Sequence, residues 1–256
     1  MTPEEARQRF REATGRSVRI AVVDSGWSSA NSDPRVLELV APREDRENHS
    51  NGDLNGHGTW CGLRVLQVAP EAEILPVRVF HDRLETSVSR LCEGIELARA
   101  SRAKVINLSL ATQRADAIHP IYRVCEAARR EGIVVVAAAL NRGGQAVPAF
   151  LEPVLSVDQG QQTDLLDFSY EPGAAIECTA AAQGVPGLDG HGRSHRRGGS
   201  STAAATLSGI VARLLEVSPG DLDHVRSLLS LISASSASAN ASSRTQVIAR
   251  KGEFEP

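Results

Sequence analysis

Three glycine-flanked segments of the chain supply the side chains that acyl transfer needs. Asp24 ends an apolar run, His57 lies between two glycines, and Ser201 precedes a long run of small apolar residues. A serine hydroxyl can attack a carbonyl, an imidazole can take its proton, and a carboxylate can hold the imidazole in the required tautomer. These residue types in the order Asp, His, Ser predict a serine hydrolase.

Each of these residues alone also has an ordinary structural explanation. An aspartate at a strand end is more often a helix cap or turn former, and an isolated histidine is more often a surface residue. Ser200 can be the N-cap of the following helix, whose free N–H groups could instead bind an oxyanion next to Ser201. The combination of segments, rather than any one residue, supports the prediction.

The elements that must position these side chains alternate along the chain. Apolar segments of strand character lie at 18–23, 73–80, 104–110, 133–139 and 154–157, and helical patterns lie at 3–13, 87–100, 122–130 and 202–215. This α/β pattern predicts a parallel sheet covered on both faces, with functional residues at the carboxyl ends of its strands. Asp24 and Asn141 follow such strands. The polar segments 43–55 and 184–199 are expected to be surface loops.

Composition restricts the class of protein. The chain has 256 residues, 41% of them hydrophobic, enough for one large core. We expect a catalytic domain over 1–232 and a Ser/Ala-rich linker with a tail over 233–256. A net charge of −3 argues against a nucleic-acid partner. The charged amino terminus and the lack of a long apolar run predict a cytoplasmic protein with no membrane partner; the sequence sets no oligomeric state.

Four cysteines lie far apart, without CxxC spacing: Cys61, Cys92, Cys125 and Cys178. Apolar neighbours favour buried reduced thiols over disulfides or a zinc site. Cys61 follows His57 by four residues, so on a helix the two would share a face and the thiol could pack beneath the imidazole.

Together these motifs resemble those of the subtilisin-like serine proteases, the subtilases. Asp24-Ser25-Gly26 is similar to the family's Asp-Ser/Thr-Gly motif, and Gly-His-Gly-Thr-Trp-Cys-Gly at 56–62 is similar to its His-Gly-Thr-His motif. Gly-Ser-Ser-Thr-Ala-Ala-Ala at 199–205 is similar to Gly-Thr-Ser-Met-Ala-Ala-Pro, which makes Ser201 the nucleophile. The resemblance covers 18–217 and implies a subtilisin-like three-layer fold, with a mostly parallel central sheet flanked by helices.

The resemblance also implies site roles and an activity. The segment 105–110 is similar to the strand that pairs with bound substrate, and 137–141 is similar to an Ala-Ala-Gly-Asn segment. Asp24, His57 and Ser201 are the expected triad, with Asn141 in the oxyanion hole. The implied activity is that of a serine endopeptidase, which cleaves a peptide or protein through an acyl-enzyme. The expected substrate contacts are Leu108, Ser109, Leu110, Ala111, Ala139 and Leu140.

Several positions depart from the family pattern. Trp60 replaces the motif's second, non-catalytic histidine, and Ala205 replaces a proline. Leu140 and Ala111 stand where glycine is common in the walls of the pocket for the residue before the scissile bond. We therefore expect a narrowed or blocked first pocket that favours Gly, Ala or Ser, although the short segment 141–157 could instead make the pocket shallow. The residues before Asp24 are too few for the family's usual folded prodomain and show no signal peptide, which predicts an intracellular enzyme with narrow specificity, such as one that matures a precursor peptide.

Two other functions stay open from the sequence. A catalytically silent subtilase fold could bind a peptide or partner protein along the same groove, and an esterase or transpeptidase could use the same triad. No cofactor is expected. Subtilases often bind calcium, but Glu44, Asp45 and Asp53 have no recognisable ligand spacing, so solvated side chains are expected there.

Overall fold

The computed structural model describes residues 2–43, 52–53, 55–80, 83–141, 143–188 and 194–233. The proposed linker and tail, 233–256, lie outside the described residues except for Ser233. The helices are α1 Pro3–Glu12, α2 His57–Val68, α3 Val88–Ala100, α4 Ala115–Arg130, α5 Ser200–Val217 and α6 Leu222–Ser233. The strands are β1 Arg19–Asp24, β2 Glu73–Arg78, β3 Val105–Leu108, β4 Val134–Ala138, β5 Leu155–Gly160, β6 Phe168–Tyr170, β7 Cys178–Ala181, β8 Val185–Leu188 and β9 Ser194–Arg197.

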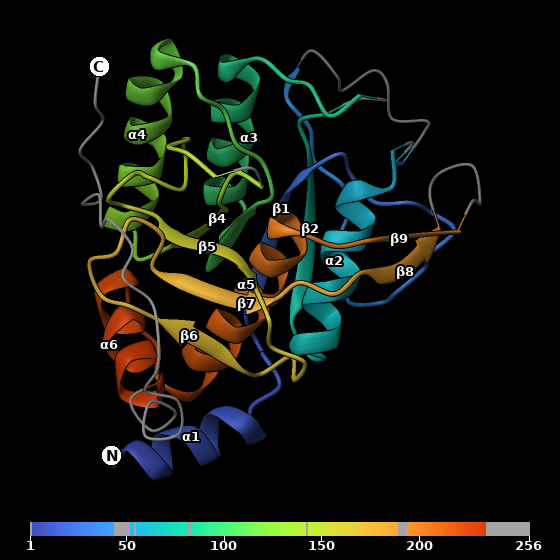
Figure 1. Cartoon of the computed structure of the whole chain (residues 1–256). Coiled ribbons are helices and arrows are strands. Elements are labelled where there is room, and N and C mark those ends of the chain that lie inside the picture. The colour runs from blue at the N-terminus through green and yellow to red at the C-terminus, as the bar shows by residue number, and fades with distance from the viewer. Residues whose placement is uncertain are drawn as a thin grey trace.

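A seven-stranded sheet in the order β2-β1-β3-β4-β5-β7-β6 forms the middle layer. Its pairs are parallel except for β6, which runs antiparallel to β7. Helices α3 and α4 cover one face, and α1, α2, α5 and α6 lie on the other (Figure 1). The predicted three-layer α/β fold is confirmed.

Buried residues of the strands alternate between two hydrophobic cores. Ile20 and Val22 of β1 pack in the core with α2 and α5, whereas Ala21 and Val23 pack in the core with α3 and α4. Both faces of the strand are therefore removed from water, which explains why its sequence is a continuous apolar run rather than an alternating pattern.

The parallel strands bring three chain segments to one edge of the sheet. Asp24 is the last residue of β1, Ser109 follows β3, and Ala139 follows β4, while the register pairs β1 with β3 and β3 with β4. The carboxyl ends of parallel strands share an edge, so residues far apart in sequence can build one site there.

The expectation of a loop over 184–199 was wrong in part. Strands β8 and β9 form an antiparallel hairpin there, with Val185 opposite Arg197 and Leu188 opposite Ser194. The two strands have four residues each and pair through backbone hydrogen bonds, and segments this short show no clear hydrophobic periodicity.

Helix α5 passes through the interior of the molecule. It packs on α2 and on the sheet, and its run from Thr202 to Leu215 is buried. At Gly209 an added Cβ would lie only 2.6 Å from the Cβ of Val68, so the glycine permits the close approach of α2 and α5. Within the described part of the chain, no helix is long and apolar enough to cross a membrane.

Candidate active site

His57 and Asp24 form a buried pair at the edge of the sheet. His57 is the first residue of α2, and its Nδ1 lies 2.8 Å and 2.9 Å from the two carboxylate oxygens of Asp24. Because a carboxylate accepts, Nδ1 carries the proton and donates. The carboxylate thus orients the ring and leaves Nε2 as the basic nitrogen.

Backbone contacts hold this pair in place. The Ser25 backbone N–H donates to Asp24 Oδ1 at 2.8 Å, and the Ser25 hydroxyl accepts from the Gly58 N–H at 2.9 Å. A Cβ on Gly58 would lie 2.5 Å from the carbonyl oxygen of Gly26, so only glycine lets α2 start this close to the end of β1.

Asp53 caps the helix that presents His57. One of its carboxylate oxygens accepts from the Gly56 N–H at 2.7 Å, and the other accepts from the N–H and hydroxyl of Thr59 at 2.8 and 2.7 Å. Asp53 is fully buried. The expectation of a solvated side chain is therefore wrong for Asp53, because its charge is stabilised by the free N–H groups of the helix start. Glu44 and Asp45 lie outside the described residues.

The surroundings of His57 set its protonation. Burial of the imidazole disfavours its charged form, but the opposing charge of Asp24, with a contribution from Cys61, outweighs burial and holds the pKa of His57 well above its usual range. A histidine in this environment keeps its second proton to a higher pH than an ordinary histidine does.

Cys61 packs beneath the imidazole, as its spacing predicted. Its Sγ lies 3.9 Å from His57 Nδ1 and donates to the Ser109 hydroxyl at 3.4 Å. Atoms of Asp24, His57 and Cys61 all lie within 4.8 Å of one another and could hold a soft metal ion. Such an ion would have to separate the Asp24–His57 pair, so it would act against acid–base chemistry.

Ser201 is placed at the start of α5, on the same edge. Its hydroxyl donates to the Ser109 carbonyl at 3.3 Å, and the Ser109 hydroxyl donates to the Ser201 carbonyl at 3.1 Å. Transfer of the Ser201 proton to His57 thus requires rotation of the hydroxyl away from Ser109. Catalytic hydrogen bonds often tighten only when substrate binds, so this geometry is compatible with the predicted nucleophile.

Asn141 lies beside the first turn of α5. Its Oδ1 accepts from the Ser200 N–H at 3.0 Å, which assigns the carboxamide oxygen and leaves Nδ2 as the group that can donate to a ligand. Gly199, with φ of +116°, comes so close that a Cβ would lie 3.0 Å from Asn141 Oδ1. The dihedral angle favours glycine there, and a larger residue would also push against the Asn141 carboxamide.

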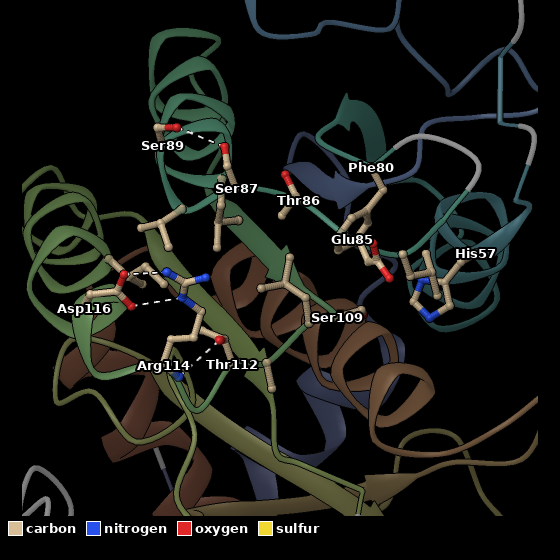
Figure 2. A pocket seen from close by; sticks show the side chains of 16 residues that line it. His57, Phe80, Glu85, Thr86, Ser87, Ser89, Ser109, Thr112, Arg114 and Asp116 are labelled. Carbon is tan, nitrogen blue, oxygen red and sulfur yellow. Dashed lines mark hydrogen bonds and ion pairs between the residues drawn. The ribbon is translucent and has the colours of Figure 1, made fainter.

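Of the six expected substrate-contact residues, three line one cavity and three do not: Leu108, Ala139 and the half-buried Leu140. Ser109, Leu110 and Ala111 line a cavity of about 510 Å³ together with His57 (Figure 2). The side chain of Leu108 is fully buried in the core with α3 and α4, and Ala139 is buried as well. Any contact from Leu108 would therefore come from its backbone.

Residues that the motifs did not single out complete the cavity wall. Phe80 and Glu85 come from the connection between β2 and α3, and Arg114 and Asp116 come from the start of α4 (Figure 2). Their sequences lie outside the recognisable motifs. Their positions beside His57 depend on how α3 and α4 pack on the same face of the sheet, so the sequence motifs could not predict them.

Comparisons with known proteins agree with this arrangement. The sequence model of the Subtilase family matches residues 15–247. M-protease of Shouchella clausii (strain KSM-K16) is 28% identical over 221 residues, which cover 82% of this chain and 57% of M-protease. The chain thus corresponds to little more than half of that relative's length.

Two solved structures share the fold. A cold adapted subtilisin-like serine proteinase aligns with a TM-score of 0.70 at 22% identity, covering 84% of this chain and 81% of the other. A lanthipeptide protease aligns with a TM-score of 0.70 at 18% identity, covering 86% of this chain and 81% of the other. At these identities the structural likeness shows the architecture alone.

Proposed function

Because the chain belongs to the subtilase family of serine proteases, we propose that it is a serine endopeptidase acting through an acyl-enzyme on Ser201. The main support is the buried Asp24–His57 pair, with an Nδ1–Oδ1 distance of 2.8 Å, at the edge where α5 presents Ser201. These are the groups that nucleophilic attack on an amide needs.

The proposed reaction divides the work among these residues. Ser201 Oγ attacks the peptide carbonyl carbon while His57 Nε2 takes the hydroxyl proton, and Asp24 stabilises the resulting imidazolium. Asn141 Nδ2 and the Ser201 N–H donate to the tetrahedral oxyanion. His57 then protonates the departing amine, and water attacks the acyl-enzyme with His57 again accepting a proton.

Hydrolysis of a mixed peptide library tests this activity. The native protein should cut peptides internally, and Ser201→Ala should reduce the rate about 10⁴-fold or more, since triad residues act as a unit. If Ser201→Ala cuts the same peptides at an equal rate, Ser201 is not the nucleophile. Adding a free amine acceptor separates hydrolysis from transpeptidation by product mass.

We further propose a narrow first pocket. Leu140 and Ala111 are half-buried, and each carries a side chain where the family's pocket walls commonly have glycine. Cleavage should follow Gly, Ala or Ser, and Leu140→Gly should extend it to larger residues. Efficient cleavage after Phe or Arg by the native protein would contradict a narrow pocket.

We propose a precursor peptide as the substrate and the cytoplasm as the location, each on its own grounds. A narrow pocket suits a dedicated processing enzyme, and one structural neighbour is described as a lanthipeptide protease. All four cysteines are free, as expected for a protein kept in a reducing compartment. Casein should stay largely intact while a peptide with a small residue before the cut is consumed; rapid casein digestion would refute this specificity.

The second candidate function is a peptide-binding module without catalysis. The observation that favours it is the Ser201 hydroxyl, which bonds the Ser109 carbonyl rather than the imidazole. A native protein that binds library peptides but leaves them uncut would establish this alternative.

A further inference from the structure

On the described wall of the cavity beside His57, one acidic side chain has no partner among the described residues. Glu85 is exposed, and Figure 2 shows its carboxylate directed toward His57 from the segment that connects β2 and α3. Among the described residues, this carboxylate takes part in no hydrogen bond or ion pair. It is therefore available to a ligand.

The other charges on the described wall of the cavity neutralise each other. Arg114 donates to both carboxylate oxygens of Asp116, Nε to Oδ1 at 3.0 Å and Nη2 to Oδ2 at 2.6 Å. The hydrogen bond from Arg114 lowers the pKa of Asp116, and the same bond raises the pKa of Arg114, so both groups stay charged and paired. The charge that His57 carries when protonated is balanced by Asp24, whose carboxylate lies 2.8 Å from Nδ1. Glu85 is thus the charged group of the described wall that has no opposite charge beside it.

Apolar side chains make up much of the remaining wall. They belong to both sides of the cavity: Phe80, Leu84, Val88, Leu91, Leu110 and Ile121. A long aliphatic stem can pack on such a surface while its charged end reaches a carboxylate. Arginine and lysine are the residues that combine these two properties.

The cavity lies on the path expected for the acyl side of a substrate. Ser109, Leu110 and Ala111, which the sequence predicts to contact substrate, form one wall of the cavity, and His57 also lines it. Ala111 is expected to belong to one wall of the first pocket as well, so the two spaces would be neighbours. Leu140 and Asn141, beside the expected first pocket, do not line it. The cavity would therefore receive a side chain that precedes the residue whose carbonyl is attacked.

We propose that Glu85 selects substrates carrying arginine or lysine at one of the three positions before that residue. This inference rests on the proposed endopeptidase function and adds a substrate class to it. The cation would pair with the Glu85 carboxylate while its stem covers the apolar wall. A glutamine of similar length would keep the packing but lose the ion pair.

The test is a peptide series with alanine fixed before the cut and each of the three preceding positions varied in turn. At one position, arginine and lysine should raise kcat/KM about 10-fold over glutamine, the size expected of one charge-assisted hydrogen bond in a partly open site. In Glu85→Gln this ratio should fall to within about 2-fold of unity, and in Glu85→Lys the position should favour glutamate instead.

Glu4→Gln is the matched control, because it removes the same charge from an exposed residue on α1, at the far end of the molecule in Figure 1. It should keep the native preference. A native protein that cuts the series without preferring a basic residue, or a preference that survives in Glu85→Gln, would overturn the role of Glu85 while leaving the endopeptidase proposal intact. A native protein that cuts none of the peptides and is not labelled by a fluorophosphonate would refute both proposals.

Discussion

At His57, two neighbours act on one imidazole in the same direction. The Asp24 carboxylate accepts a hydrogen bond from the Nδ1–H group at 2.8 Å, and Cys61 Sγ lies 3.9 Å from the same nitrogen. Both favour the imidazolium, and together they outweigh the opposing effect of burial on the pKa of His57. A base that must be neutral to act is thereby held in its charged form over a wider pH range.

The pH dependence of turnover should report this balance. Nε2 can accept the Ser201 proton only when the imidazole is neutral, so activity is lost as the pH falls through the raised pKa of His57. We expect kcat/KM to rise with pH through a midpoint above the value of ~6.5 for an ordinary histidine. Circular dichroism over the same range checks that the protein stays folded. A midpoint at or below about 6.5 would contradict this account of His57.

Asn141 should act on the transition state rather than on substrate binding. Its carboxamide is oriented by the Ser200 N–H at 3.0 Å, with Nδ2 left to donate. We predict that Asn141→Ala lowers kcat about 100- to 1,000-fold, equivalent to ~3–4 kcal/mol, with little change in KM. Water can replace the lost acceptor for Ser200, because position 141 is exposed.

Steady-state kinetics on one peptide substrate measure this effect. Gln113→Ala is a suitable comparison, because it removes another exposed amide, whose Nε2 donates to the Gln145 carbonyl at 3.4 Å. Its kcat should stay within about 2-fold of the native value, as for most surface substitutions. A raised KM with unchanged kcat in Asn141→Ala would mean that Asn141 binds substrate and leaves the oxyanion unassisted.

At the scale of elements, α2 and α5 bring their first turns to one edge of the sheet. His57 begins α2, and Ser201 is the second residue of α5. Their N–H groups are unpaired at these ends, so each helix needs acceptors there. Asp53 supplies them for α2, and Asn141 supplies one for α5.

Loss of the Asp53 cap should destabilise the fold and the position of His57 together. Asp53→Ala leaves buried donors of Gly56 and Thr59 without an acceptor. We expect the free energy of unfolding to fall by about 2–3 kcal/mol in urea titration, with a loss of activity. Asp167→Ala, which removes a half-exposed ion pair with Arg11, should cost less than ~1 kcal/mol. Equal losses in the two variants would show that Asp53 has no special role.

The crossing of α2 and α5 should tolerate no added methyl group at Gly209. A Cβ there would lie 2.6 Å from Val68 Cβ, and the cost of overpacking, ~1–3 kcal/mol, should exceed the gain in helix propensity of ~1 kcal/mol. Gly209→Ala should therefore unfold at lower urea concentration. Adding Val68→Gly should recover part of the loss, because it removes both clashing atoms, Cβ at 2.6 Å and Cγ1 at 2.8 Å; strictly additive losses in the double-mutant cycle would disprove the steric explanation.

At the scale of the whole molecule, the sequence predicted the elements that are buried on both faces. Ile20 and Ala21 belong to different cores, so residues 20–23 of β1 are all apolar, and this run predicted the strand. The short strands β8 and β9 were not, because their pairing depends on contacts between neighbouring backbones rather than on a hydrophobic pattern. Strand boundaries also differ: β4 ends at Ala138, three residues before Asn141.

The candidate site, too, was only partly predictable from the sequence. Motif spacing predicted that Asp24 and His57 would meet, and it named Ser201 and Asn141, whose catalytic roles stay predictions. The role of Asp53 could not be predicted, because an aspartate in a polar loop becomes a buried cap only when α2 folds beside β1. The position of Glu85 at the cavity could not be predicted either, because it depends on the packing of α3 against the sheet.

The central claim is that Asp24, His57 and Ser201 form one assembled catalytic unit. Intact-protein mass spectrometry after treatment with a fluorophosphonate probe tests it most directly, on the native chain and on Ser201→Ala and Ser200→Ala. The account predicts a single adduct on the native protein and on Ser200→Ala, and none on Ser201→Ala. No adduct on the native protein, or an adduct that persists in Ser201→Ala, would contradict it.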